Sequence, residues 1–231
     1  MTDEDVDNLL ENYKRHRKAY SGFMNNVIDF FKSDNDGLLD HDGHFVVHSV
    51  KFREKATTHL EEKIRRKNTE GQPVTKENLF TRINDFCGVR VLHLRLSDFE
   101  LIHSAISNHV SSQFWAFAEP PKAYTWDPEY KSFFESLDVK TEIKESFYTS
   151  VHYVVKPNVD NFVCCEIQVR TLFEEVWGEI DHDLNYPVKT EVIACREQLK
   201  VLAKLVGAGT KLVDSIYNSI PSCDQKDQQM P

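Results

Sequence analysis

Apolar side chains recur at intervals of three and four residues in several stretches of this chain. Near the N-terminus they are Leu9, Leu10, Tyr13, Phe23, Met24, Val27, Ile28 and Phe31. This spacing places one apolar stripe along a helix and predicts a helix over residues 3–32. The same spacing predicts helices over 171–184 and 191–220, and residues 50–67 also fit a helix, one that is strongly basic.

Alternation of apolar and polar side chains, which is typical of half-buried strands, dominates the middle of the chain. A first strand is predicted around Val89, Val91, Leu92 and Leu94, and further strands over 139–145, 146–156 and 162–170. Residues 120–131 are rich in turn-forming residues and are predicted to form a loop. The order of helices and strands predicts an α+β fold, a mixed β-sheet flanked by helices.

Two local signals refine these boundaries. Ser97 followed by Glu100 matches a capping box and predicts a helix that runs to about Val110. The segment 33–44, SDNDGLLDHDGH, contains several aspartates, but its glycine is at the wrong offset for a calcium-binding loop. We therefore interpret this segment as a solvated loop.

Length and composition indicate a globular protein: 231 residues, 40% of them hydrophobic and 28% charged. We expect an N-terminal helical segment and loop over 1–44, a central domain over 45–190, and a C-terminal helix and tail over 191–231. No apolar run is long enough to span a bilayer and no signal-peptide core is present, which favours a cytoplasmic location. The five cysteines have no zinc-site spacing and are expected to be free thiols.

The net charge of −9 argues against broad binding to nucleic acid, because phosphate contacts need a basic surface. A local basic cluster stands out: Lys51, Arg53, Lys55, Lys63, Arg65, Arg66 and Lys67. Within it, Arg53, Lys55 and Lys63 are candidates for neutralising a triphosphate. The alternative is a solvated helix held by charge pairs such as Glu62 with Arg66.

Two neighbouring predicted strands each place three polar side chains on one face. Strand alternation groups Glu166, Gln168 and Arg170 on one strand, and Tyr148, Ser150 and His152 on the strand before it. The residues between the latter, Val151, Tyr153 and Val155, are the predicted core set. A polar face turned to solvent is the alternative, but histidine, carboxylate and aromatic side chains together favour a functional site.

A second carboxylate, Asp85, precedes the strand that begins near Gly88. Magnesium in phosphoryl-transfer sites is held by one or two carboxylates and by substrate phosphates. Asp85 and Glu166 are therefore the predicted metal ligands, with Gly88 allowing close approach of a ligand and Arg90 suited to phosphate. A turn between helix and strand is the alternative role for Asp85.

These stretches resemble the synthetase domain of the RelA/SpoT family, the (p)ppGpp synthetases. Five motifs carry the resemblance in order over about residues 45–190: Arg53-x-Lys55-x3-His59-x3-Lys63, Asp85-x2-Gly88-x-Arg90-Val91, Tyr148-x-Ser150-x-His152, Glu166-Ile-Gln168-x-Arg170-Thr171, and Trp177-x3-Asp181-His182. The resemblance implies a nucleotidyltransferase-like synthetase fold with added N- and C-terminal helices. It also implies an enzyme that moves the β,γ-pyrophosphate of ATP to the 3′-hydroxyl of GDP or GTP.

The resemblance also implies the roles of individual residues. Asp85 binds magnesium, and Glu166 binds magnesium, takes the 3′-hydroxyl proton, or does both. The residues implied to bind ATP are Arg53, Lys55, Lys63 and Arg90. Tyr148 and His152 are implied to hold the acceptor, with the tyrosine ring stacking on the base, while Gln168, Arg170 and Ser150 support the site.

The chain departs from the family pattern at several positions. Phe147 replaces the glycine before the tyrosine, His59 a serine, and Asp181 a glutamate; Asp183, Asn185 and Pro187 stand where basic residues are usual. These changes leave the acceptor open between guanosine nucleotides, adenosine nucleotides and the 3′ end of tRNA. A catalytically inactive regulator is a further alternative. We expect a stand-alone small synthetase, with a homo-oligomer and an antitoxin as possible partners.

Overall fold

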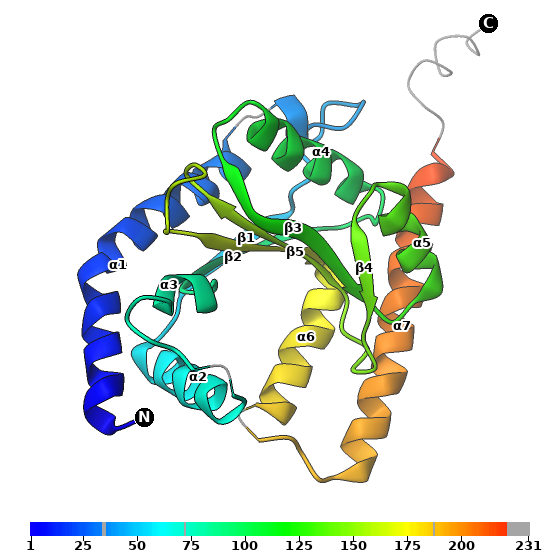
Figure 1. Ribbon diagram of the computed structural model, residues 1–231. Helices are drawn as coiled ribbons and strands as arrows, with labels where there is room; N and C mark the ends of the chain where they lie inside the picture. Colours follow the sequence, from blue (N-terminus) through cyan, green and yellow to red (C-terminus); the bar gives the residue numbers. More distant parts are fainter. Residues whose placement is uncertain (34–35, 72, 187, 221–231) are drawn as a thin grey trace, which may run out of the picture.

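A six-stranded mixed sheet forms the centre of the protein in the computed structural model, which describes residues 1–33, 36–71, 73–186 and 188–220 (Figure 1). The strands are β1 (Ser49–Glu54), β2 (Cys87–His93), β3 (Ala116–Thr125), β4 (Lys140–Ile143), β5 (Ser150–Lys156) and β6 (Cys165–Thr171). Their order is β1-β2-β6-β5-β3-β4, with parallel pairs β2/β6 and β3/β4. The predicted α+β class is confirmed.

Helices cover this sheet. They are α1 (Asp3–Lys32), α2 (Thr57–Thr69), α3 (Leu79–Arg82), α4 (Asp98–Ser111), α5 (Pro128–Ser136), α6 (Leu172–Asn185) and α7 (Ile193–Asn218), with a 3-10 turn at Asp36–Leu38. Capping boxes begin two of them, from Thr2 with Asp5 at α1 and from Thr171 with Glu174 at α6. The second cap fixes where β6 ends and α6 begins, directly after the predicted site residues.

The core lies on the face of the sheet that packs against α1 and α4. The predicted core set, Val151, Tyr153 and Val155, is fully buried there. The pairing of β5 with β6 extends the same apolar face to the neighbouring strand, since Val151 pairs with Val169 and Tyr153 with Ile167. The polar side chains of β5 and β6 therefore point to the opposite face, toward α6.

The prediction of one basic helix over 50–67 is wrong in its first part. Residues Ser49–Glu54 form strand β1, which pairs antiparallel with β2, and α2 begins only at Thr57. Val50 and Phe52 alternate with Lys51 and Arg53, so the strand period was present in the sequence. The correction matters because it places Lys51 and Arg53 on one face, two residues apart.

Two further predictions are wrong. Residues 120–131 are not a loop, because β3 extends to Thr125 and α5 begins at Pro128 after the Asp127 cap. Ser97 does not form a capping box with Glu100, since its hydroxyl instead donates to Asp214 of α7 at 2.8 Å. The carboxylate of Asp214, which is far away in the sequence, therefore accepts hydrogen bonds at the start of α4.

Helix α7 lies beside α6, as Figure 1 shows. The indole Nε1 of Trp177 donates to the Leu199 carbonyl at 2.9 Å across this contact. Much of the predicted apolar stripe of both helices nevertheless faces solvent: Phe173, Val176, Ile180, Leu184, Leu205, Leu212 and Ile216 are exposed. Among the helices of the described residues, none combines the length and apolarity that crossing a bilayer requires.

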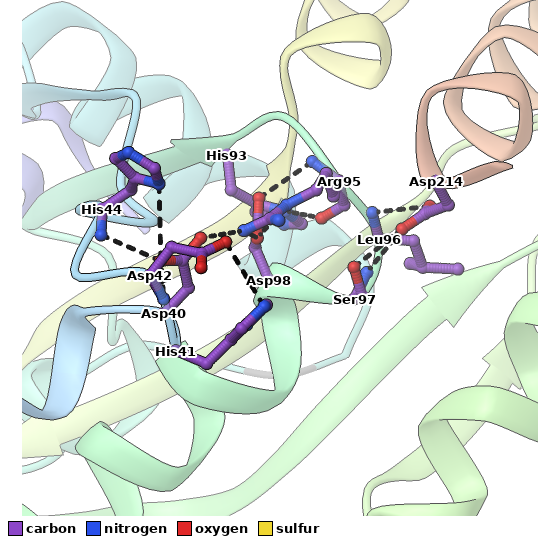
Figure 2. A network of polar contacts seen from close by, with 10 residues as sticks. All are labelled: Asp40, His41, Asp42, His44, His93, Arg95, Leu96, Ser97, Asp98 and Asp214. Atoms are coloured by element: carbon purple, nitrogen blue, oxygen red, sulfur yellow. Dashed lines mark hydrogen bonds and ion pairs between the residues drawn. The ribbon is translucent and has the colours of Figure 1, made fainter. Parts of the chain in front are cut away.

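The aspartate-rich loop 36–44 is held by protein contacts (Figure 2). Asp40 accepts from the backbone N–H of His44 at 2.8 Å and from Arg95 Nη2 at 3.0 Å. Asp42 is exposed and lies 3.3 Å from His41 Nε2, whereas Leu38 and the Asp40 side chain are buried, so the predicted solvated loop over 33–44 holds only in part; residues 34–35 lie outside the described residues. Four cysteines are free thiols as predicted, Cys87, Cys164, Cys165 and Cys195, and Cys223 lies outside the described residues.

Candidate active site

Glu166 is the centre of a chain of hydrogen bonds across β5 and β6. His152 Nδ1 lies 3.1 Å from Glu166 Oε1, and Gln168 Nε2 donates to Glu166 Oε2 at 2.9 Å. The Tyr148 hydroxyl lies 2.9 Å from His152 Nε2. The imidazole of His152 thus contacts the carboxylate through one ring nitrogen and the tyrosine hydroxyl through the other. Glu166, His152 and Tyr148 thus form one connected group, as strand alternation predicted.

The Glu166 carboxyl is ionised at neutral pH. Burial opposes its ionisation, but the hydrogen bond and charge of His152, with Gln168, lower the pKa of Glu166 below its usual range. The negative charge of Asp85 acts in the other direction and raises this pKa, so the two carboxylates lie close enough to interact.

Asp85 is held between two lysines from the neighbouring segments. Lys55 Nζ lies 2.7 Å from one carboxylate oxygen, and Lys63 Nζ lies 2.7 Å from the other. Burial opposes ionisation of this carboxyl, but the charges of Lys63 and Lys55 lower the pKa of Asp85. The site therefore presents an ionised aspartate whose two oxygens already face cationic groups.

Two adjoining cavities contain these carboxylates. The first, about 300 Å³, is lined by Lys51, Phe52, Arg53, Gly88, Val89, Arg90, Glu166, Gln168, Glu179 and His182. The second, about 620 Å³, is lined by Arg53, Glu54, Lys55, Ala56, His59, Glu62, Lys63, Arg66, Asp85, His182 and Tyr186. Arg53 and His182 line both, so the cavities meet between α2, β1 and α6. Tyr148 and His152 line neither cavity and reach the site through Glu166.

The cations of the first cavity are paired with acidic residues of α6. Arg90 Nη1 contacts Glu179 and lies 3.3 Å from Glu175 Oε1, to which Lys51 donates at 2.8 Å. Arg170 is buried, and its guanidinium contacts Glu175 rather than Glu166. Arg170 thus supports the site from beneath.

Ser150, the remaining supporting residue, is also buried. Its hydroxyl donates to the Val169 carbonyl at 3.3 Å, a contact between β5 and β6 that holds the two strands together.

Comparison with known proteins identifies the family of this chain. The family described as the region found in RelA / SpoT proteins matches residues 52–191, more than half of the chain. The chain belongs to the RelA/SpoT family.

The relatives of this RelA/SpoT chain include a GTP pyrophosphokinase and a small alarmone synthetase. It is 23% identical over 196 residues to the GTP pyrophosphokinase YwaC of Bacillus subtilis, covering 82% of each chain. The crystal structure of small alarmone synthetase 1 from Bacillus subtilis superposes with a TM-score of 0.65 at 20% identity, covering 94% of this chain and 97% of the other. The same protein bound to its product pppGpp gives 0.64 at 20% identity over 90% and 95%. At this identity the structures show that the fold is shared.

Some site residues were not predicted from the sequence. His182 lines both cavities, although the sequence indicated it only as the last residue of the Trp177 motif. Lys51 belongs to the basic cluster, but the helix prediction hid its strand position. The sequence does not single out Glu175 and Glu179, because it carries no signal that α6 crosses over Arg90.

The departures from the RelA/SpoT pattern have structural consequences. Phe147, at the usual glycine position, has φ 65°, the left-handed conformation that glycine adopts without strain. His59 is exposed and packs edge-on against Tyr186 with ring centres 5.7 Å apart. Asp183 is exposed and Asn185 donates to Asp181 at 2.8 Å, while Pro187 lies outside the described residues.

Proposed function

We propose that this chain is an ATP-dependent pyrophosphokinase that transfers the β,γ-pyrophosphate of ATP to the 3′-hydroxyl of GDP or GTP and makes (p)ppGpp. The observation that carries the proposal is the pairing of two ionised carboxylates, Asp85 and Glu166, in adjoining cavities rich in cations. The relatives support it, since one is named a GTP pyrophosphokinase and another was crystallised with its product pppGpp.

The donor set of the site fits a divalent metal. Two carboxylates with lowered pKa values offer oxygen ligands, and the two lysine ammonium groups on Asp85 show that its oxygens already attract cations. We infer that Asp85 and Glu166 hold Mg²⁺ when the triphosphate engages Lys55 and Lys63. The bound metal supplies charge neutralisation at the phosphates.

The cations that line the two cavities are expected to bind ATP. Arg53 and Arg90 line the first cavity beside Glu166, and Lys55 and Lys63 line the second beside Asp85. Pyrophosphoryl transfer depends mainly on in-line positioning and on neutralising charge, so such a fixed array of cations is the protein's main contribution. This placement favours adenine near Arg53 and Arg90, with the phosphates directed toward Lys55 and Lys63.

The acceptor is expected beside Tyr148 and His152. The ring of Tyr148 offers a π-face for a purine, an interaction that contributes about 1–3 kcal/mol. In the transfer, the acceptor 3′-oxygen forms a bond to the β-phosphorus of ATP, the bond to the α-phosphate oxygen breaks, and AMP leaves. The 3′-hydroxyl proton passes to Glu166 or to water. The lowered pKa of Glu166 favours its role as a metal ligand over its role as a strong base.

The test is to incubate the protein with γ-labelled ATP, Mg²⁺ and each candidate acceptor in turn. Label in ppGpp or pppGpp supports the proposal. Label in an adenosine nucleotide or at the 3′ end of tRNA, with none in guanosine nucleotides, would reject the acceptor but keep the transfer chemistry. ATP binding without any labelled product would indicate an inactive regulator.

The remaining expectations concern location and partners. We expect the enzyme to act in the cytoplasm. The exposed apolar residues of α6 and α7, including Val176, Leu205 and Leu212, support self-association of the chain through these helices. Sedimentation of the wild type and of Leu205→Glu at matched concentrations tests this, because a charge on that face should shift an oligomer toward monomer. An antitoxin partner stays a prediction.

A further inference from the structure

The turn over residues 40–44 brings three metal-ligating side chains together, those of Asp40, Asp42 and His44 (Figure 2). One ligand atom of each, a carboxylate oxygen or an imidazole nitrogen, lies within 4.8 Å of the ligand atoms of the other two. None of the three residues lines either cavity of the candidate active site. The cluster is therefore separate from the proposed magnesium site.

The backbone of this turn fixes the spacing of the three side chains. Leu39 and Phe45 form a β-bridge that closes the loop. Inside it, the Asp40 N–H donates to the His44 carbonyl at 2.8 Å. Gly43 has φ 78°, a left-handed conformation that lets the chain reverse here, and its N–H donates to the Asp40 carbonyl at 3.0 Å. Asp40 and His44 consequently face each other across the turn.

Asp40 is fixed by contacts with the protein itself. One carboxylate oxygen accepts from the backbone N–H groups of Asp42 at 3.1 Å and His44 at 2.8 Å. The other accepts from Arg95 at 3.0 Å. Burial opposes ionisation, but the hydrogen bonds from His44 and Arg95 lower the pKa of Asp40, so the carboxylate is charged at neutral pH. An ionised carboxylate offers about four acceptor positions, so these three bonds leave one for a metal ion.

The other two side chains are accessible to an ion from solvent. The His44 side chain is 79% exposed, and its Nδ1 lies 3.7 Å from Asp40 Oδ1, too far for a hydrogen bond. Ligand atoms in a tetrahedral zinc site with bonds of about 2.0–2.1 Å are about 3.4 Å apart, so this gap is close to that between two ligands. Asp42 is also exposed, and His41 Nε2, 3.3 Å from Asp42 Oδ2, helps to orient its carboxylate.

The mixture of imidazole and carboxylate ligands selects the kind of ion. Calcium and magnesium prefer oxygen ligands, whereas imidazole nitrogen suits zinc and other transition metals. The glycine offset that excludes a calcium-binding loop does not exclude zinc, which takes fewer ligands at shorter distances. We propose that Asp40, Asp42 and His44 form a zinc-binding site, with water as the fourth ligand.

A zinc ion at this turn strengthens the junction between the loop, α4 and α7. Arg95, which holds Asp40, also pairs with Asp98 at the start of α4 and lies 4.8 Å from the ring centre of Tyr217 on α7. Because the three ligands are brought together only by folding, zinc binds the folded chain in preference to the unfolded chain and stabilises it. The inference does not depend on the proposed function, since it involves neither nucleotide.

The experiment titrates Zn²⁺ into the untagged full chain by calorimetry, with millimolar Mg²⁺ present so that the proposed magnesium site is occupied. The wild type should take up one zinc ion per chain. At a zinc concentration about 100 times the Kd, its melting temperature should rise by several degrees. Asp42→Ala and His44→Ala should each bind zinc at least about tenfold more weakly and lose this shift.

His48→Ala is the matched control, because His48 is an exposed histidine of the same segment that lies outside the cluster. It should retain both the zinc uptake and the shift in melting temperature. Melts without zinc establish that each variant is folded, and His44→Gln replaces His44→Ala if the alanine variant is not. A wild type without one-to-one zinc uptake would overturn the inference. So would wild-type affinity in the folded His44 variant, or an equal loss of zinc binding in His48→Ala.

Discussion

His152 Nδ1 and Glu166 Oε1 lie 3.1 Å apart, although the two residues are on different strands. The register explains the contact: His152 pairs with Gln168, so Glu166 is its diagonal neighbour on the same face. The Tyr148 hydroxyl completes the arrangement on the other imidazole nitrogen. Strand pairing alone thus brings the proposed acceptor residues to the proposed metal ligand.

Glu166→Gln should lower pyrophosphate transfer by at least about 100-fold, because the amide has nearly the same shape but lacks the negative charge at the reacting groups. The fold should remain, since the amide oxygen can still face His152 while Gln168 turns its own amide oxygen toward the new NH2 group. Initial rates with saturating ATP and GDP measure the effect, and a thermal melt is the control. Wild-type rates in the folded variant would remove Glu166 from the mechanism.

Asp85→Asn should also abolish most transfer, for a different reason. The neutral amide gives up its attraction for Lys55 and Lys63 as well as for a divalent ion. We therefore expect a higher Mg²⁺ requirement, measured as the concentration that gives half-maximal activity. Lys55→Met is the matched comparison: it should raise the KM for ATP while leaving the Mg²⁺ requirement closer to wild type. An unchanged Mg²⁺ dependence in Asp85→Asn would contradict the assignment.

Glu175 should make stability depend on pH in the acidic range. Burial opposes its ionisation, but the charges of Arg170 and of its other partners lower the pKa of Glu175 to about 2. Since its folded pKa is below the unfolded value, its contribution is complete above about pH 4.5 and is lost as pH falls toward 2. Urea unfolding between pH 3 and 6 should show a steep loss for wild type.

Two variants check this pH dependence. Glu175→Gln should be less stable at pH 6 and should show a much flatter profile down to pH 3. Glu174 gives the opposite sign: burial raises its pKa, so its contribution is present at low pH and is lost as pH rises. The free energy of unfolding of Glu174→Gln should therefore increase relative to that of the wild type as pH rises. A parallel pair of profiles for wild type and Glu175→Gln would show that the ion pairs contribute nothing.

Much of the sheet could be predicted because its central strands carry their own signal. In β5 and β6 the residues facing α1 and α4 are mostly apolar, and the alternation is visible without knowing the partner strand. Strand β1 was missed because it lies at the sheet edge and three of its side chains, Lys51, Phe52 and Arg53, are exposed. Exposure weakens the burial pattern, and a run of basic residues then looks like a solvated helix.

Strand periodicity predicted which side chains of the site share a face of the sheet, but not what those side chains contact. Alternation placed Glu166, Gln168 and Arg170 on one face, as the structure shows. It could not show that Arg170 turns under α6 and pairs with Glu175, because that depends on the close approach of the helix at Gly178. The role of Ser97 was misjudged for a similar reason, since its partner lies 117 residues away.

Asp214 anchors α7 to the start of α4, as Figure 2 shows. Its carboxylate accepts from the backbone N–H of Leu96 at 2.9 Å and from both the N–H and the hydroxyl of Ser97. Asp214→Ala should cost about 1–2 kcal/mol of unfolding free energy, because the helix start loses its cap. Ser97→Ala removes only the hydroxyl and should cost less. Equal urea midpoints for Asp214→Ala and wild type would contradict this anchor.

Phe147 offers a test of backbone strain beside the acceptor tyrosine. Its φ of 65° is unfavourable for any side chain, and its ring packs against Trp126 with centres 5.0 Å apart. Phe147→Ala loses the ring contact and keeps the strain, whereas Phe147→Gly loses the contact and relieves the strain. The alanine variant should therefore be less stable than the glycine variant by about 1 kcal/mol, measured by urea unfolding. If the two variants instead ranked in order of helix or strand propensity, with alanine more stable, Phe147 would not hold this conformation in solution. The GDP affinity of the glycine variant then reports how far the Trp126 contact, rather than the backbone, positions Tyr148.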